Sequence, residues 1–237
     1  MIDAHVHLWR KQEGCVNGLP VYGLGNGRSM FGAEVRQMLP PYMTDGVNSA
    51  ERLLSCMDFA QVAGAVVTQE YIDGNQDAYL RQVRVAYPDR FRITALYEEK
   101  GVPDTSGVDG IKICGGRLDN PDLTACEAVF AHAAGKDLFI AIDMADGDRQ
   151  TASLREMARQ YPGLRIAIGH FGMVTRPGWQ EQIRLARLPM YLWNPAGSPG
   201  SSTVSSIRIL PLSGPFWRPG ISAGWKSSCG GPIIPGP

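Results

Sequence analysis

Apolar and polar residues follow a repeating order along residues 1–188, in which short apolar runs alternate with longer amphipathic segments. Short apolar runs predict strands, and segments whose apolar residues recur every three or four positions predict helices. A long glycine-rich loop is expected between the first strand and the first helix, up to about Val47, and Asn48-Ser49 could cap that helix. Strands are predicted over residues 2–9, 64–71, 91–97, 107–113, 138–144 and 165–172, and helices over residues 50–64, 76–86, 121–134, 149–160 and 178–188.

Strands that alternate with helices in this way are typical of parallel sheets built from βα units. Several of the strands are apolar along nearly their whole length, as expected when both faces of a sheet are covered. Six such units fit either a TIM-type (β/α)8 barrel that lacks strands seven and eight or an open doubly-wound sheet. No GxGxxG follows the first strand, which weakens the second option. The pattern therefore predicts an α/β fold with a parallel sheet and leaves both arrangements open.

Composition changes abruptly at Pro189, which divides the chain into a barrel region, residues 1–188, and a tail, residues 189–237. The tail holds about half of the 17 prolines, is rich in Ser and Gly, and contains no Asp, Glu or His. Such composition is typical of a disordered tail. A second interpretation is that the tail is translated in the wrong reading frame.

The second interpretation depends on what the tail encodes when it is read one base earlier. With permitted codons, residues 225–235 then give Val-Glu-Lys-Leu-Met-Trp-Gly-Ser-Asp-Tyr-Pro, and residues 192–207 give a stretch with acidic and aromatic side chains. A strand-like segment that ends in a carboxylate is not expected from a genuine Pro/Ser linker. We therefore expect a single-base slip near residues 188–190 and an out-of-frame, disordered tail.

Global charge and cysteine content narrow the classes of partner and compartment. Lys plus Arg and Asp plus Glu both total 23, so nothing indicates nucleic acid or an anionic membrane as a partner. No apolar run is long enough for a transmembrane helix, and the N-terminus lacks the pattern of a secretory signal. The five cysteines show no CxxC spacing, which favours reduced thiols. We expect a cytoplasmic protein with a small-molecule substrate. A homo-oligomer is possible, and the sequence does not determine the oligomeric state.

His5 and His7, on the first predicted strand, are the leading chemical signal. Side chains two positions apart in a strand project from the same face, so both imidazoles can reach one metal ion. Neutral imidazole suits zinc and other divalent transition metals. An isolated HxH is a weak motif, so its context decides.

Three polar residues lie near the ends of later predicted strands: Lys112, Asp143 and His170. The carboxyl ends of the strands of a parallel barrel converge on one mouth, where a metal would lower the pKa of bound water and polarise a substrate carbonyl. Asp143 either binds the metal or only forms a hydrogen bond. Lys112 could bind a substrate carboxylate, bridge metals if carbamylated, or be a structural lysine.

Several further residues are candidates for the mouth. Glu70 and Tyr71 end the second predicted strand and could line the mouth, with loop capping as the alternative. Arg117 and Arg176 could hold an anionic substrate in bidentate fashion, and a solvated loop charge is the competing interpretation. His132 lies in the middle of a predicted helix and is interpreted as structural.

Two segments carry a family resemblance. MIDAHVHLW, residues 1–9, resembles the opening strand of the amidohydrolase-related (amidohydrolase 2) branch of the amidohydrolase superfamily, and IAIGHFG, residues 166–172, resembles its sixth-strand His-x-Gly segment. The shifted Trp-Gly-Ser-Asp-Tyr-Pro resembles the eighth-strand aspartate motif of the same branch. The resemblance implies that His5 and His7 bind a metal and that His170 sits at the metal or acts on the substrate.

The chain departs from the family pattern in two places. The strand-eight aspartate, the last ligand and proton acceptor of the family, has no counterpart in the chain as translated. Many relatives carry a metal-binding histidine at the end of strand five, where this sequence has Asp143. Some members of the branch are thought to work without a tightly held metal, so occupancy stays open.

The resemblance implies an α/β fold of the TIM (β/α)8-barrel type, incomplete in this chain because strands seven and eight are lost. It also implies a hydrolase that uses a divalent metal, zinc by preference, to act on a small, carboxylated lactone or amide-like substrate. The assigned residues are His170 as catalytic residue, His5, His7, His170 and Asp143 as metal ligands, and Lys112, Arg117, Glu70 and Tyr71 as substrate-binding residues. The first alternative is a non-oxidative decarboxylase on the same scaffold. The second is an inactive, truncated product.

Overall fold

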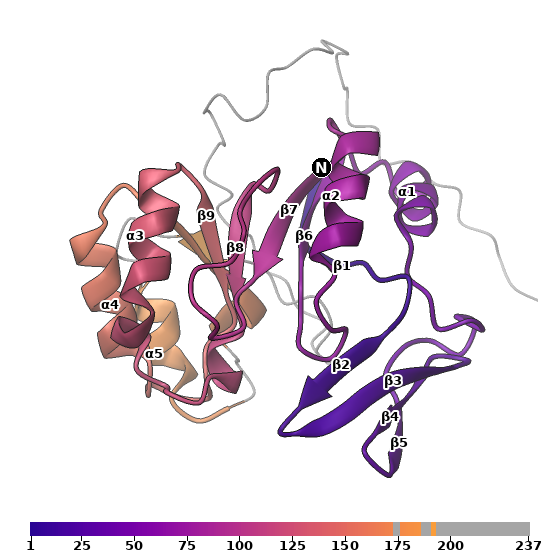
Figure 1. Ribbon diagram of the computed structural model, residues 1–237, viewed down its shortest axis with the longest axis horizontal. Coiled ribbons are helices and arrows are strands. Elements are labelled where there is room, and N and C mark those ends of the chain that lie inside the picture. The colour runs from indigo at the N-terminus through magenta and orange to yellow at the C-terminus, as the bar shows by residue number, and fades with distance from the viewer. Residues whose placement is uncertain (173–175, 186–190, 193–237) are drawn as a thin grey trace, which may run out of the picture. The chain divides into compact units, whose positions relative to one another are not determined.

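A parallel sheet forms the centre of the computed structural model, which describes residues 1–172, 176–185 and 191–192 (Figure 1). Its seven strands lie side by side in the same order as along the chain. The labels β2 to β5 belong to a second sheet, which is inserted between β1 and β6. Every neighbouring pair is parallel. The strands are β1 (Ile2–His7), β6 (Gly64–Thr68), β7 (Phe91–Leu96), β8 (Gly110–Ile113), β9 (Phe139–Ile142), β10 (Arg165–Ile168) and β11 (Tyr191–Leu192).

The strand order identifies the type of α/β fold. A doubly-wound sheet reverses its strand order at a switch point, whereas the strands of a TIM barrel follow the chain order around the barrel. No reversal occurs in β1-β6-β7-β8-β9-β10-β11. The sheet is therefore part of a TIM-type barrel, as predicted, and it is incomplete in the described residues.

The helices also agree with the sequence pattern. Ser49 caps the first helix, because its side chain accepts a hydrogen bond from the backbone N–H of Arg52. The segment predicted as one helix over residues 121–134 consists of a 3₁₀ turn, Leu123–Cys126, followed by an α-helix. The α-helices are α1 (Ala50–Phe59), α2 (Asp77–Ala86), α3 (Glu127–Gly135), α4 (Thr151–Gln160) and α5 (Trp179–Arg184).

Two short elements depart from the predicted boundaries near the C-terminal side. The sixth predicted strand ends at Ile168, and Gly169–Gly172 form a 3₁₀ turn. Tyr191–Leu192 pair with β10, which was not predicted, because these residues lie in the segment assigned to the tail. Residues 186–190 and 193–237, which include the rest of the predicted tail, lie outside the described residues.

The prediction of a long glycine-rich loop after β1 is wrong, because a four-stranded antiparallel sheet lies there. Its first two turns are Asn17-Gly18 and Asn26-Gly27, and all four residues have positive φ. Asn-Gly with positive φ at both positions is the favoured two-residue turn of a β-hairpin. The strands are β2 (Glu13–Val16), β3 (Leu19–Gly25), β4 (Arg28–Phe31) and β5 (Glu34–Gln37).

The inserted sheet is fastened to the loop that follows β6, residues 69–76. The backbone N–H of Cys15 donates to the Tyr71 carbonyl at 2.9 Å. A Cβ on Gly14 would lie 2.0 Å from the same carbonyl oxygen, so only glycine allows this approach. The Gln12 amide then bridges the two parts, because it donates to Asp73 at 3.1 Å and accepts from Ser29 at 2.6 Å.

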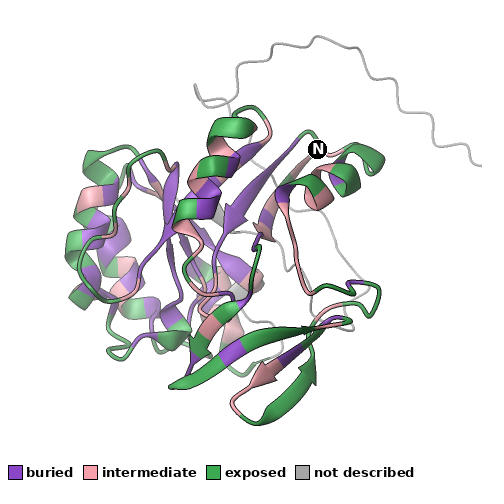
Figure 2. Ribbon diagram, turned by 45° about the vertical axis from the view of Figure 1, so that its right-hand side comes forward, coloured by how far each residue is buried: buried purple, intermediate pink, exposed green. Residues whose placement is uncertain are grey.

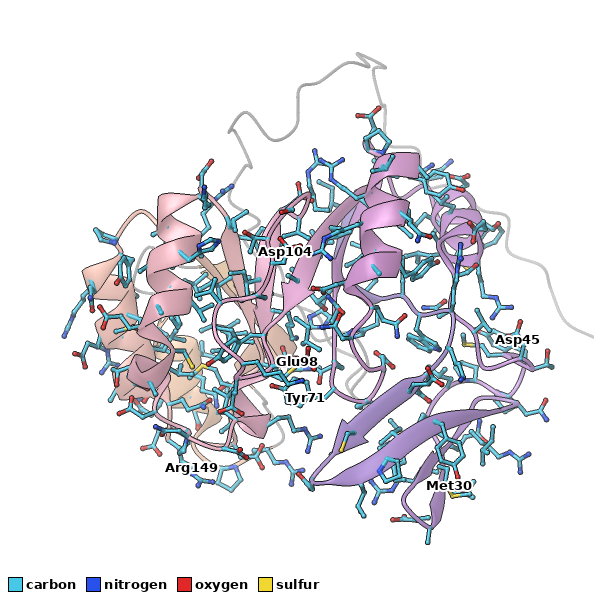
Figure 3. The ribbon with its side chains drawn as sticks, viewed as in Figure 1. Met30, Asp45, Tyr71, Glu98, Asp104 and Arg149 are labelled. Atoms are coloured by element: carbon cyan, nitrogen blue, oxygen red, sulfur yellow. The ribbon has the colours of Figure 1, made fainter. Side chains whose placement is uncertain are left out.

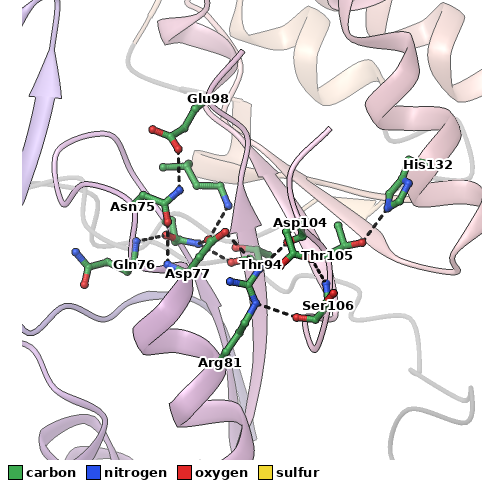
Figure 4. Close-up of polar contacts among 12 residues, drawn as sticks. Asn75, Gln76, Asp77, Arg81, Thr94, Glu98, Asp104, Thr105, Ser106 and His132 are labelled. Atoms are coloured by element: carbon green, nitrogen blue, oxygen red, sulfur yellow. Dashed lines mark hydrogen bonds and ion pairs between the residues drawn. The ribbon is translucent and has the colours of Figure 1, made fainter. Parts of the chain in front are cut away.

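A polar network holds the connection between β7 and β8, which contains no helix (Figure 4). The Arg81 guanidinium on α2 donates to the Ser106 and Asp104 carbonyls at 2.9 and 2.7 Å. The Asp77 carboxylate accepts from the Gln69 amide at 2.7 Å and from the Leu96 N–H at 3.1 Å. These bonds fix the ends of β6 and β7 relative to α2.

Burial follows this architecture (Figure 2). Strands β6 to β10 are almost fully buried, whereas most residues of β1 are only partly buried. Apolar side chains from strands and helices form two clusters, one that contains Ile140 and one that contains Phe91. The inserted sheet is mostly exposed, apart from residues such as Val21 and Ser29 at 1% exposure. None of the described helices is long and apolar enough to cross a lipid bilayer.

Candidate metal centre

His5 and His7 project together from β1. Their Nε2 atoms lie 3.1 Å apart. Two imidazole nitrogens that bind one tetrahedral zinc ion at about 2.0–2.1 Å lie about 3.3–3.4 Å apart. The ladder between β1 and β6 is irregular between Asp3 and Val6, at the point where His5 sits. The pair thus has about the separation of two ligands of one metal ion.

Asp143 and His170 reach His5 from two other strands. Asp143 follows β9 directly, and His170 lies in the 3₁₀ turn after β10. One ligand atom from each of His5, Asp143 and His170 lies within 4.8 Å of the other two. The His170 and Asp143 side chains also contact each other, with Nε2 and Oδ2 3.4 Å apart. These three residues form a set that could hold a metal ion.

The backbone after β10 is shaped to bring these groups close. His170 has a φ of 51°, in the left-handed region that non-glycine residues rarely adopt. A Cβ on Gly169 would lie 1.9 Å from Asp143 Oδ1 and 3.4 Å from His5 Cε1. Glycine at position 169 therefore leaves the space that the carboxylate occupies.

Electrostatics keep the two β1 imidazoles neutral. Burial, assisted by the nearby Lys112 ammonium, lowers the pKa of His5 to about 2 and that of His7 to about 4. A neutral imidazole offers a nitrogen lone pair to a metal. His7 Nδ1 and Asp143 Oδ1 are buried atoms without a hydrogen-bond partner among the described residues. The donor set, which includes the unpaired Asp143 Oδ1, fits a divalent metal such as zinc. His7 Nδ1 adds nothing to this fit, because the His7 nitrogen that lies 3.1 Å from His5 Nε2 is Nε2.

The pKa values of the other two members of the set, Asp143 and His170, are shifted in opposite directions. Burial opposes ionisation of Asp143, but the Lys112 ammonium and the contact with His170 hold the pKa of Asp143 well below its ordinary value. The hydrogen bond that His170 donates to the Asp143 carboxylate raises the pKa of His170, although burial opposes the shift. The site thus combines an ionised carboxylate with a histidine that binds a proton more readily than usual.

Lys112 and Glu70 lie against this cluster. The Lys112 side chain is 0% exposed, its Nζ lies 3.3 Å from Glu70 Oε1, and it forms a close ion pair with Asp143 Oδ2. Burial raises the pKa of Glu70 to about 7, although Lys112 opposes the shift. Pairing of Lys112 with two carboxylates was not predicted. A charged residue inside the apolar strand Gly110–Ile113 was the available signal, because a buried charge needs a partner.

The remaining candidates lie outside the cluster. The Tyr71 hydroxyl donates to the Tyr97 carbonyl at 2.9 Å, and Tyr71 is marked in Figure 3 beside Glu98. Arg117 is exposed in the 3₁₀ turn after β8, Gly115–Arg117, and forms no ion pair within the described part of the chain. The Arg176 Nε atom lies 3.4 Å from Asp146 Oδ2. His132 Nε2, on α3, lies 2.8 Å from the Thr105 hydroxyl oxygen.

A family model described as amidohydrolase matches residues 2–200, which is most of the chain. The chain belongs to the amidohydrolase family. Members of this family are metal-dependent hydrolases, and family membership supports an enzyme. None of the curated proteins matches this amidohydrolase chain.

Solved structures show the same fold at low sequence identity. A probable 2-pyrone-4,6-dicarboxylic acid hydrolase from Acinetobacter baumannii, with citric acid bound, has a TM-score of 0.58 and 15% identity. An amidohydrolase 2 from Bifidobacterium longum subsp. infantis has a TM-score of 0.52 and 20% identity. An amidohydrolase from Burkholderia multivorans with bound zinc has a TM-score of 0.51 and 13% identity. The matches cover 81% of this chain and 68%, 71% and 68% of the neighbours, in that order.

Proposed function

We propose that this amidohydrolase-family chain carries a hydrolase site at the carboxyl ends of its parallel strands, with His5, His7, Asp143 and His170 as metal ligands. The observation that carries the proposal is that His5 on β1, Asp143 directly after β9 and His170 in the turn after β10 place ligand atoms within 4.8 Å of one another. Convergence of this kind at the carboxyl ends of barrel strands is where TIM-barrel active sites lie.

Zinc is the metal that the donor set favours, because it consists of imidazole nitrogens and a carboxylate. When bound, the metal would lower the pKa of a water molecule and polarise a substrate carbonyl. The chain's own groups would orient the substrate and move protons. His170 is also the candidate catalytic residue, since its side chain is 36% exposed and could contact a substrate beside the metal.

The substrate that we propose is a small, carboxylated lactone or amide-like molecule. The Acinetobacter neighbour is named for a dicarboxylated pyrone and holds citric acid, which supports a substrate with carboxylates. Arg117 is the group that we assign to a substrate carboxylate, because it is exposed after β8 and has no ion pair among the described side chains. Tyr71 and Glu70 follow β6 at the same end of the sheet.

Zinc binding tests the proposed site directly. Zinc is titrated into the metal-free full chain in competition with a chromophoric chelator, and we expect one zinc ion per chain. His5→Ala and His170→Ala should each weaken zinc binding at least tenfold, because each removes a ligand. His132→Ala is the matched control and should bind zinc as the wild type does, since His132 contacts Thr105 on another part of the fold. Equal zinc binding by all four proteins would contradict the proposal.

Turnover requires a proton acceptor beyond these ligands, and we propose that the out-of-frame tail has removed it. The support is the change in composition at Pro189 and the segment Trp-Gly-Ser-Asp-Tyr-Pro obtained from residues 229–235 one base earlier. A gene with one added base near the codon for residue 189 restores that aspartate. We expect this frame-restored chain to release acid from small carboxylated lactones and the given chain to be an inactive product. Evolution of carbon dioxide in the same assay would indicate the alternative, a decarboxylase.

A further inference from the structure

Lys112 occupies an unusual place for a lysine in a sheet. It lies in β8, and its side chain is completely buried. An isolated buried ammonium is strongly unfavourable, so its partners determine whether the fold tolerates it. Its ion-pair partners among the described residues are Glu70, after β6, and Asp143, after β9. Lys112 therefore connects the carboxyl ends of three strands.

The two oxygens of Asp143 have different surroundings. Oδ2 accepts from Lys112 and lies 3.4 Å from His170 Nε2. Oδ1 is buried, has no hydrogen-bond partner among the described residues, and lies against Gly169 near His5. The carboxylate is thus anchored through one oxygen, and the other oxygen is left for a metal.

Glu70 offsets the charge of the lysine. Its Oε1 faces the Lys112 ammonium, and its Oε2 accepts from the Cys114 thiol at 3.5 Å. When both carboxylates are ionised, they exceed the ammonium by one negative charge. A trio with that excess attracts a divalent cation, whereas Lys112 and Asp143 alone would be neutral.

We propose that Lys112 is a positioning residue that anchors Asp143 through Oδ2, so that Oδ1 is presented to the metal, and that Glu70 compensates the lysine charge. This inference depends on the proposed metal site. It assigns Lys112 and Glu70 to the support of a ligand, in place of contact with the substrate. Hydrogen-bonded groups behind a metal ligand orient that ligand and tune its metal affinity.

The test compares zinc affinity and the visible spectrum of bound cobalt at pH 8 in the full chain and its variants. Lys112→Met should weaken zinc binding by about 10–100-fold, the usual effect of losing a group behind a ligand. It should also change the cobalt spectrum, because a loose Asp143 changes the coordination. Glu70→Gln should weaken zinc binding and leave the cobalt spectrum like that of the wild type. Lys100→Met is the control, since Lys100 is exposed and its ion-pair partner among the described residues is Glu98, with Nζ and Oε1 3.5 Å apart.

The outcomes separate this inference from the proposed function. If Lys112→Met binds zinc as tightly as the wild type or more tightly, Lys112 does not position Asp143 and the inference is overturned, while the metal site stands. If the wild type binds no zinc, both are overturned. If a thermal melt shows that Lys112→Met does not fold, Glu70→Gln decides: weaker zinc binding supports the inference, and unchanged binding overturns it.

Discussion

Asp143 is the residue at which the interactions of the site meet. It contacts Lys112 and His170, and one of its oxygens lies within 4.8 Å of a ring nitrogen of His5. Asp143 directly follows β9, and all four residues of that strand are apolar. A single carboxylate therefore couples the imidazoles of β1 to the turn after β10.

The space at Gly169 gives the first prediction. Gly169→Ala should displace Asp143, because the added Cβ would lie 1.9 Å from Oδ1. We expect zinc affinity, measured by chelator competition, to fall at least about tenfold, as for other changes that move a ligand. Gly163→Ala is the control, since a Cβ there meets nothing within 4 Å. Equal zinc affinity in the two variants would show that Asp143 is not held against Gly169.

Part of the site could be predicted from single residues. The two-residue spacing of His5 and His7 predicts a shared face, and the strand ends predict the approach of Asp143 and His170, which the structure brings together. The ion pairs of Lys112 could not be predicted, because they depend on side-chain contacts between three strands. The role of Gly169 depends on the same contacts.

At the scale of elements, the attachment of the inserted sheet gives a pH-dependent prediction. Burial raises the pKa of Asp73 from its ordinary value of 3.8 to about 6, although the Gln12 hydrogen bond opposes the shift. Because the folded state holds this proton more tightly than the unfolded state does, the contribution of Asp73 to stability is full below pH 3.8 and is lost as the pH rises to about 6. Asp73→Asn removes that loss.

The measurement is the free energy of unfolding by urea at pH 4 and at pH 7. From pH 4 to pH 7, the free energy of unfolding should fall by roughly 1–3 kcal/mol more in the wild type than in Asp73→Asn. Groups that titrate in both proteins cancel in this comparison. Asp119→Asn, at an exposed aspartate, is the control and should follow the wild type. If Asp73→Asn also followed the wild type, the Asp73 carboxyl would not be buried in the attachment.

The close backbone contact of the inserted sheet gives a third prediction. Gly14→Ala should lower the midpoint of thermal unfolding and expose residues 13–37 to limited proteolysis, because the new Cβ would lie 2.0 Å from the Tyr71 carbonyl oxygen. An overpacked core site typically loses about 1–3 kcal/mol. Gly135→Ala, where a Cβ meets nothing within 4 Å, should show neither effect. A Gly14→Ala protein that resists proteolysis like the control would contradict the attachment.

The inserted sheet is the element that the prediction missed. Its turns at Asn17-Gly18 and Asn26-Gly27 are strong hairpin signals, but the many glycines between residues 14 and 32 favoured a loop. The helices were easier to predict, because their amphipathic period extends over about ten residues in α1, α2 and α4.

At the scale of the whole molecule, alternation of strands and helices predicts the parallel barrel-type sheet, and the strand order confirms it. Sequence alone left a doubly-wound sheet open, because the order of strands in space depends on contacts between distant segments. The described strands end at β1 on one side and β11 on the other. Exposed strand edges favour association between chains.

The reading frame of the tail gives the prediction at this scale. The frame-restored chain should be more soluble than the given chain and should hydrolyse substrate, because it would supply in-frame residues for the last part of the barrel and the late aspartate. The measurements are the yield in the supernatant, the oligomeric state by light scattering, and acid release. A soluble, monomeric given chain with full hydrolase activity would contradict the proposal that residues 189–237 are out of frame.

The location of the metal tests the central claim most directly. Crystals of the chain grown with zinc would be measured at the zinc absorption edge, and the anomalous difference map would locate the ion. We predict one strong peak at zinc–ligand distances, about 2.0–2.2 Å, from His5, His7 and His170 nitrogens and from Asp143 Oδ1. The absence of a peak at these four residues, or a peak only elsewhere on the protein, would contradict the account.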